Sequence, residues 1–132
     1  MRMRQLLTIV AVLGISAPLG LAQDSSSFRT LYSFTSQSDG SNPVAGVVIG
    51  SGGVLYGTTA AGGTSNAGTV FSLTPPASPG GAWTENVLHS FTGGIDGADP
   101  VAALVIGKNG VLYGTTSSGG ASNAGTVFAL KP

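Results

Sequence analysis

Short runs of apolar residues alternate with glycine-rich polar stretches along most of the chain. The runs are five to nine residues long and rich in β-branched and aromatic residues, as β-strands are. Beyond residue 22 no stretch keeps the period of an amphipathic helix. We therefore expect an all-β protein with almost no helix, whose strands cover residues 28–34, 45–49, 54–59, 69–74, 83–91, 102–106, 111–116 and 126–131.

The stretches between these runs carry turn-forming residues. Residues 107–110 read Gly-Lys-Asn-Gly, and the equivalent residues 50–53 read Gly-Ser-Gly-Gly. An Asn-Gly pair supplies the two positive φ angles that a type I′ hairpin turn requires. We therefore expect a hairpin at each of these two places.

The sequence repeats itself after 57 residues. Residues 31–75 align with residues 88–132 without a gap, and 30 of these 45 positions are identical. A period of about 40 to 60 residues is typical of propeller blades and related stacked β-units. The repeat therefore predicts two antiparallel, four-stranded, blade-like units that pack on each other as a partial propeller or a small β-sandwich.

The expected domain covers residues 23–132. Repeat one spans about residues 28–75, a linker rich in proline and glycine spans residues 76–82, and repeat two spans about residues 83–132. The expected core comes from the apolar strand positions and their copies in repeat two, which in repeat one are Phe34, Val47, Ile49, Leu55, Val70, Phe71 and Leu73. Gly57 and Gly114 follow the same tyrosine and should share a backbone constraint, such as a positive φ or a close strand approach.

The first 22 residues have the features of a Sec-type signal peptide. Arg2 and Arg4 form a positive start, residues 6–15 are nearly all apolar, and small residues precede an expected cleavage site after Ala22. An uncleaved anchor is the alternative, but this run is short for a hydrocarbon core of about 30 Å and Pro18 follows it. We therefore expect secretion, into the extracellular space or the periplasm, and no membrane association after cleavage.

A long motif occurs twice. The string YGTT..GG.SNAGTVF.L covers residues 56–73 and 113–130, and L.SF...DG..P precedes it each time. In this motif the chain resembles the GloVer-type (choice-of-anchor) tandem-repeat family of bacterial secreted proteins. The resemblance implies a β-propeller-like extracellular protein, commonly with more repeats and a C-terminal surface anchor, and it implies no catalytic residues. Because this chain has two repeats and ends at Pro132 without such an anchor, a truncated piece of a longer array is one expectation.

Composition excludes several classes of protein. Charged residues make up 8% of the chain, against about 25% in an ordinary soluble domain. Nucleic-acid binding through phosphates needs clustered Lys and Arg, which are missing here. Without cysteine there is no disulfide, no thiolate nucleophile and no cysteine-bound metal. We expect no cofactor and no nucleic-acid partner.

Acidic side chains are the first candidates for chemistry. Asp39 and Asp96 are equivalent, and a glycosidase would need two carboxylates about 5 to 10 Å apart. An Asp-Gly turn whose carboxylate accepts backbone N–H bonds accounts for both residues more simply. Asp99 adds an oxygen donor near Asp96, but the donors are too few to predict a calcium site. His89 is the only histidine and its counterpart is Tyr32, which argues against a general base, so we expect no catalytic residues.

Repeated aromatic and amide side chains are candidates for sugar binding. They are Tyr56 with Tyr113 and Asn66 with Asn123. Packing within the third strand of each repeat is the competing explanation for the two tyrosines. These four residues and the three aspartates form the set of candidate ligand-binding residues.

The sequence favours a secreted, non-enzymatic β-repeat module that binds or assembles. A carbohydrate-active protein, lectin-like or glycoside hydrolase-like, is the alternative, with a glycan as its partner. The expected strand at residues 126–131 has no charge before Lys131, so little protects its edge from another strand. Repeats that stack on their neighbours need about three copies or polar capping units. We therefore expect a homo-oligomer of two to four chains, or association with other β-repeat chains.

Overall fold

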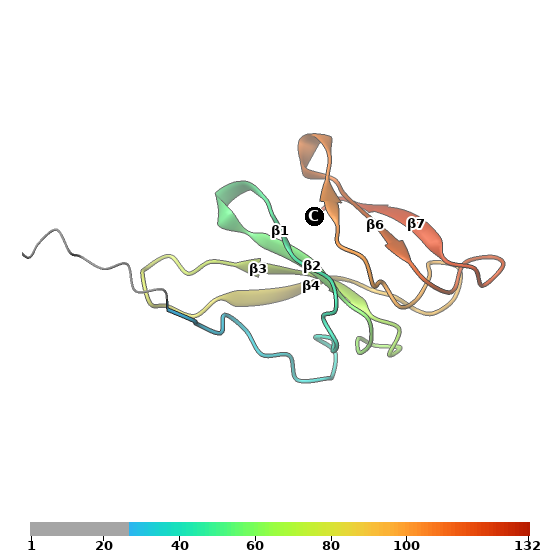
Figure 1. The fold of residues 1–132 in the computed structure, drawn as a ribbon, viewed down its shortest axis with the longest axis horizontal. Helices are drawn as coiled ribbons and strands as arrows, with labels where there is room; N and C mark the ends of the chain where they lie inside the picture. The colour runs from blue at the N-terminus through green and yellow to red at the C-terminus, as the bar shows by residue number, and fades with distance from the viewer. Residues whose placement is uncertain (1–26) are drawn as a thin grey trace, which may run out of the picture.

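The computed structural model describes residues 27–132, so the expected signal peptide, residues 1–22, lies outside the described residues. The described chain forms two antiparallel sheets, one of four strands and one of three (Figure 1). The prediction of an all-β fold is confirmed. No helix within residues 27–132 is long and apolar enough to cross a membrane.

Sheet one has the strand order β1-β2-β3-β4. Its strands are β1 (Val48–Ile49), β2 (Leu55–Thr59), β3 (Thr69–Thr74) and β4 (Thr84–Ser90). Sheet two has the order β5-β6-β7, with β5 (Val105–Ile106), β6 (Leu112–Thr116) and β7 (Thr126–Leu130). Two 3₁₀ turns, η3 (Ser51–Gly53) and η4 (Lys108–Gly110), join the first two strands of each sheet. In η4 Asn109 and Gly110 have φ values of 57° and 74°, and Val111 N–H donates to Lys108 O over 3.2 Å, as the Asn-Gly pair predicted.

The fourth strand of sheet one comes from the second repeat. β4 pairs with β3 along its whole length, with a bulge between Val70 and Phe71. The residues expected to link two units, 76–82, therefore connect two strands of the same sheet (Figure 1). The expectation that each repeat builds its own four-stranded sheet is wrong, because the first strand of repeat two pairs with the last strand of repeat one.

The matching segment of repeat one forms no strand. Residues 28–34, which were expected to be a strand, have no ladder pairing in the structure. They lie against sheet one through Phe34, whose ring meets that of Phe71 edge-to-face at 5.0 Å between centroids. In Figure 1 this blue-to-cyan stretch runs along the side of sheet one that faces away from β6 and β7. Its counterpart in repeat two, β4, pairs with the last strand of the preceding repeat, and the described residues hold no such strand before residues 28–34.

The core lies between the two sheets. Its centre joins repeat one to repeat two through Ala67, Val70, Phe91, Leu104 and Leu112. Val48, Tyr56 and Ile106 pack at its margin. Every predicted core position is buried or half-buried in at least one repeat, but three members are exposed: Val47, Ile49 and Val127. Each of the three lies on a sheet face that no other sheet covers.

Candidate functional site

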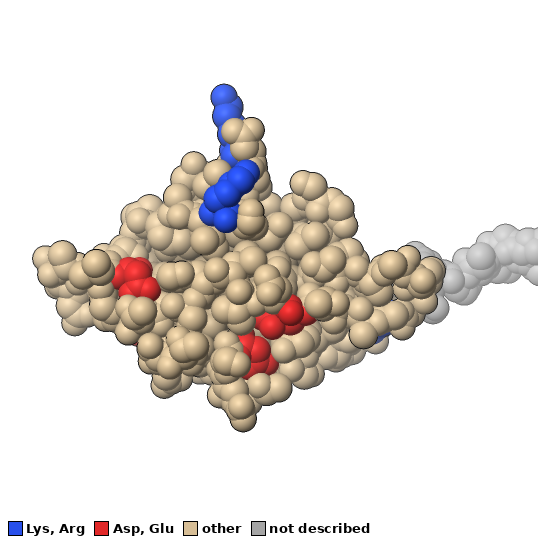
Figure 2. Space-filling model, turned by 180° about the vertical axis from the view of Figure 1, so that it is seen from behind, with Lys and Arg blue, Asp and Glu red and all other residues tan. Residues whose placement is uncertain are grey.

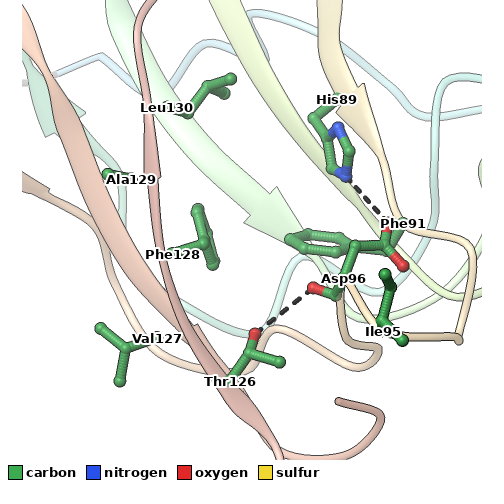
Figure 3. A pocket seen from close by; sticks show the side chains of 9 residues that line it. All are labelled: His89, Phe91, Ile95, Asp96, Thr126, Val127, Phe128, Ala129 and Leu130. Carbon is green, nitrogen blue, oxygen red and sulfur yellow. Dashed lines mark hydrogen bonds and ion pairs between the residues drawn. The ribbon is translucent and has the colours of Figure 1, made fainter. Parts of the chain in front are cut away.

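An open strand edge and a hollow beside it mark the second repeat. β7 is the last strand of its sheet, whereas its equivalent β3 carries β4 on the same side. A hollow with a volume of about 250 Å³ lies beside β7. Figure 3 shows the side chains that line it. Its lining comes from the end of β4, the loop that follows it and β7, namely His89, Phe91, Ile95, Asp96, Thr126, Val127, Phe128, Ala129 and Leu130. Most of these side chains are apolar, so the hollow suits an apolar occupant.

The outer face of sheet two is exposed where its counterpart in sheet one is buried. We use this name for the side of β5–β7 that carries Val105, Tyr113, Thr115, Val127 and Ala129. Val127 is 82% exposed, while Val70 is fully buried. Thr115 is exposed and Thr58 is buried. Since the two repeats share these residue types, the difference lies in what covers them: sheet two covers sheet one, and nothing within residues 27–132 covers the outer face of sheet two.

The far face of sheet one is the complementary surface. It carries Val47 and Ile49, which are 48% and 71% exposed. The residue equivalent to Val47 is Leu104, which is 2% exposed because sheet one packs over it. Each end of the two-sheet stack therefore presents an apolar face whose equivalent is buried inside the stack.

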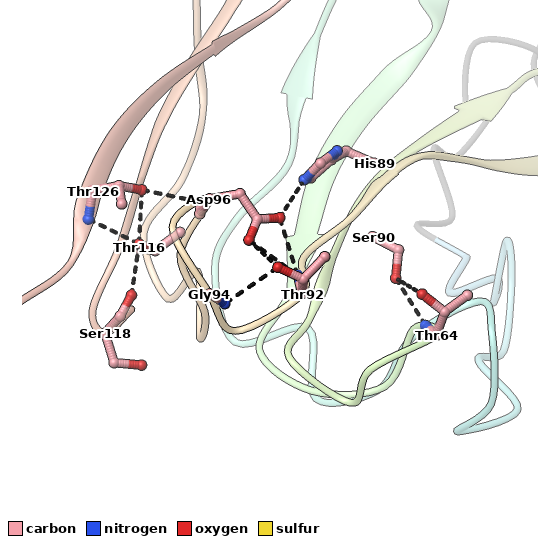
Figure 4. Close-up of polar contacts among 9 residues, drawn as sticks. All are labelled: Thr64, His89, Ser90, Thr92, Gly94, Asp96, Thr116, Ser118 and Thr126. Atoms are coloured by element: carbon pink, nitrogen blue, oxygen red, sulfur yellow. Dashed lines mark hydrogen bonds and ion pairs between the residues drawn. The ribbon is translucent and has the colours of Figure 1, made fainter. Parts of the chain in front are cut away.

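Asp96 holds the turn beside the hollow. Its carboxylate accepts hydrogen bonds from Thr92 N–H at 3.0 Å and from the Thr92 hydroxyl, and it pairs with His89 Nε2 at 3.1 Å (Figure 4). These donors outweigh the effect of burial, which by itself raises a carboxyl pKa, and they lower the pKa of Asp96. The Asp-Gly turn expected from the sequence is therefore present, with the carboxylate as its central acceptor.

Asp39 does the same in repeat one. It accepts from Thr35 N–H and the Thr35 hydroxyl, both at 2.7 Å, and from the Tyr32 hydroxyl at 2.9 Å. Although burial raises the carboxyl pKa, these bonds and a longer one from Gln37 N–H lower the pKa of Asp39 to about 2. Burial and the bond to Asp39 raise the pKa of the Tyr32 phenol to about 12. Tyr32 thus makes the contact to Asp39 that His89 makes to Asp96 in repeat two.

Glu85 is the acidic neighbour of this first turn. It lies on β4 opposite Leu73. Burial, and then the negative charge of Asp39, raise the pKa of Glu85. Its Oε1 atom is buried without a hydrogen-bond partner. The Glu85 carboxylate is therefore unfavourably placed in the corner formed by Tyr32 and Asp39, because it is partly buried near a second negative charge and its Oε1 makes no hydrogen bond.

The other candidate residues serve their own loops or strands. Asn66 and Asn123 have a φ of 53° and accept from Gly62 N–H and Gly119 N–H, each at 2.9 Å. Asp99 is exposed and accepts from the Ser118 hydroxyl at 3.1 Å.

The two tyrosines differ between the repeats. Tyr56 packs at the margin of the core, whereas Tyr113 is 45% exposed on the outer face of sheet two. The structure therefore does not gather the seven candidates into one place, and a ligand-binding role for any of them stays a prediction.

The face drawn in Figure 2 carries few charged side chains, with the basic ones together at one projection and the acidic ones away from it. Among residues 27–132 no three His, Asp or Glu side chains come together as a metal site would require. The surface around the hollow is thus neither strongly acidic nor strongly basic. Little like-charge repulsion would oppose the approach of a second apolar face.

The comparison with protein families identifies the type of repeat. A family model described as the Gloeobacter/Verrucomicrobia repeat matches residues 19–132. The chain belongs to this family. The match confirms the resemblance drawn from the duplicated motif. Among curated proteins, none matches the chain.

The edge of the strand at residues 126–131 was expected to be unprotected, but the pairing of β4 with β3, which leaves β7 without such a partner, was not predicted from the sequence. The expected linker between the repeats, residues 76–82, lies where the structure has a hairpin loop. A signal was available: seven residues rich in Pro, Gly and Ala between two strand-like runs are compatible with a hairpin loop. Such a loop places the following strand beside the preceding one and leaves the last repeat one strand short.

Proposed function

We propose that the protein is an exported, non-enzymatic β-repeat module whose function is assembly with further β-repeat chains. The observation that carries this proposal is the open edge of β7, next to an outer face on which Val127 is 82% exposed. Exposed edges are usually blunted by charge, proline or a bulge. Residues Thr126–Leu130 carry none of these.

The sheets support a propeller-like mode of assembly. Each would be one blade, with the outer face of one packing on the far face of the next. A closed propeller has about four to eight blades, and this chain supplies two. We therefore propose a homo-oligomer of two to four chains. Export is supported by the signal-like sequence of residues 1–22.

Sedimentation equilibrium of the purified protein over a range of concentrations tests this function. We expect a mass of two to four chains that falls on dilution. Val127→Lys places a charge at the centre of the outer face and should leave a folded monomer. Because Val127 is 82% exposed, this change costs the isolated chain little. A folded wild-type monomer at every concentration would contradict the proposed function.

A further inference from the structure

We propose that residues 28–34 of a second copy of this chain pair with β7 as its missing antiparallel strand, in the register that β4 takes on β3. In this arrangement the far face of sheet one in the second copy covers the outer face of sheet two in the first. The inference rests on the proposed function and names the segment that performs it.

The pairing of β4 with β3 supplies the template. Leu73 lies opposite Glu85, Ser72 opposite Asn86 and Val70 opposite His89. The repeat offset of 57 residues converts each pair into a contact between copies. The predicted pairs are Leu130 with Phe28, Ala129 with Arg29 and Val127 with Tyr32, the second residue of each pair belonging to the second copy.

The hollow beside β7 fits the residue that this register brings to it. Phe28 is 94% exposed in the isolated chain. Its predicted partner, Leu130, lines the hollow together with Phe91 and Phe128. The equivalent corner of repeat one holds Glu85, whose Oε1 lacks a partner. In this position the exposed phenyl ring of Phe28 would be buried against apolar side chains, which is favourable. Unlike Glu85 near Asp39, it would place no second negative charge near Asp96.

The two apolar faces are complementary because their equivalents pack on each other inside the chain. Inside the chain Val70 and Leu104 belong to one buried cluster with Phe91. Between copies the same places are taken by Val127 of the first copy and by Val47 and Phe34 of the second. Val47 and Val127 are two of the three exposed members of the predicted core, and the proposed contact buries them as the equivalent Leu104 and Val70 are buried.

The loop after residues 28–34 already has the conformation found at the equivalent place in repeat two. Within the chain Phe91 N–H donates to Gly68 O at 2.9 Å, and Asp99 N–H donates to Ala67 O at 3.0 Å. The equivalent donors are Phe34 and Asn42. Asn42 has a φ of 57°, close to the 53° of Asp99, and Gly40 has 107° against 106° at Gly97. The loop after residues 28–34 is therefore preorganised, which lowers the entropy cost of docking.

This contact uses different surfaces on the two copies. Such a heterologous contact generates a closed ring when the rotation allows it and an open filament when it does not. Direct β7-to-β7 pairing would instead be isologous and would stop at a dimer. The two modes bring different residues together, so they can be separated by chemical cross-linking.

The protein has no cysteine, so a pair of cysteines reports one contact. We would mix two single-cysteine variants, Ala129→Cys and Arg29→Cys, and oxidise them under mild conditions. Both residues are exposed, and Arg29→Cys removes only surface hydrogen bonds from Arg29 Nη2 to Gly80 O and Gly81 O, so neither change should disturb the fold. Directly opposed strand residues lie about 4.5 to 5.5 Å apart at Cα, which suits a disulfide. We expect the mixed Ala129→Cys–Arg29→Cys dimer as the main product.

Two control pairs fix the register. Ser72→Cys with Asn86→Cys in one chain should form an internal disulfide, because these residues are paired in sheet one. Thr30→Cys replaces Arg29→Cys in the second mixture. Its side chain would point to the opposite side of the strand, so it should react with Ala129→Cys at least about tenfold more slowly.

A third pair of variants tests the role of Phe28 in the contact. Phe28→Glu introduces the residue found at the equivalent position of repeat two, Glu85. It should weaken self-association by about tenfold to a hundredfold. Val44→Glu is the matched control, since the equivalent Val101 stays 49% exposed beside the buried interface. It should change self-association by less than about threefold. Equal effects of the two variants would contradict a specific place for Phe28.

The outcomes separate this inference from the proposed function. Mixed disulfides at residues 129 and 29 support both. An oligomer in sedimentation that yields only Ala129→Cys homodimers, or no disulfide at all, overturns the strand pairing and leaves assembly intact. A folded monomer at every concentration overturns both.

Discussion

Val70 and Val127 occupy the same position in the two repeats, yet Val70 is fully buried and Val127 is 82% exposed. Both lie in equivalent strands, β3 and β7, opposite equivalent threonines, Thr58 and Thr115. Sheet two covers the first valine, and no part of the described chain covers the second. The same side chain therefore stabilises the fold in one repeat and is available for assembly in the other.

Truncating these two valines should have very different effects on stability. Val70→Ala leaves a cavity in the core and should lower the free energy of unfolding by about 1 to 3 kcal/mol. Val127→Ala is the matched control and should change it by less than about 0.5 kcal/mol when unfolding is measured at a concentration at which sedimentation gives a monomer. Urea unfolding followed by far-UV circular dichroism measures both. Similar losses in the two variants would show that Val127 is covered within one chain.

Alanine at the repeated glycines should be destabilising in both repeats. A Cβ atom at Gly57 would lie 2.6 Å from Cζ of Phe71, and one at Gly114 would lie 2.5 Å from Cζ of Phe128. These rings cross the glycines of the neighbouring strand, so Gly57→Ala and Gly114→Ala should each cost about 1 to 3 kcal/mol in thermal or urea unfolding. Gly46→Ala is the control, because a Cβ there meets nothing within 4 Å. A cost at Gly46 equal to that at Gly57 would argue against the ring contact as the cause.

Stability should fall between about pH 5 and pH 2. The folded pKa of Asp39 is about 2, below its usual value of 3.8, so the unfolded chain binds more protons over this range. The stabilisation from this carboxylate is complete above its unfolded pKa and is lost as the pH falls through its folded pKa. Melting temperatures measured from pH 5 to pH 2 should therefore decrease, and Asp39→Asn should flatten that decrease. Asp96→Asn should act in the same direction, since the pKa of Asp96 is also lowered. An unchanged slope in Asp39→Asn would contradict this origin.

The exported protein should begin at Gln23. Arg2 and Arg4, the apolar run of residues 6–15 and the small residues before the expected site predict cleavage after Ala22. Intact-mass measurement of the protein recovered from the medium or periplasm gives the N-terminus directly. Recovery of the full-length chain from a membrane fraction would instead indicate an uncleaved anchor.

Local chemistry alone predicted most of the strands and turns. The β-branched runs at residues 69–74 and 111–116 contain the whole of β3 and β6, and the Asn109-Gly110 pair formed the expected turn. Asp39 and Asp96 became turn acceptors because an aspartate before glycine can bond backbone groups a few residues away. These features depend on neighbours in sequence, which is why the sequence contains them.

The sequence by itself therefore determined the all-β class, the duplicated unit, the family motif and the turns. Tertiary structure decided which strand pairs with which. Residues 28–34 and Thr84–Ser90 have the same place in their repeats, but only the second segment has a neighbouring edge, that of β3, to pair with. Pairing depends on which edge a connecting loop can reach, and a repeat pattern is the same whether a strand joins its own unit or the one before it. For the same reason, identical valines at positions 70 and 127 became a core residue and a surface residue.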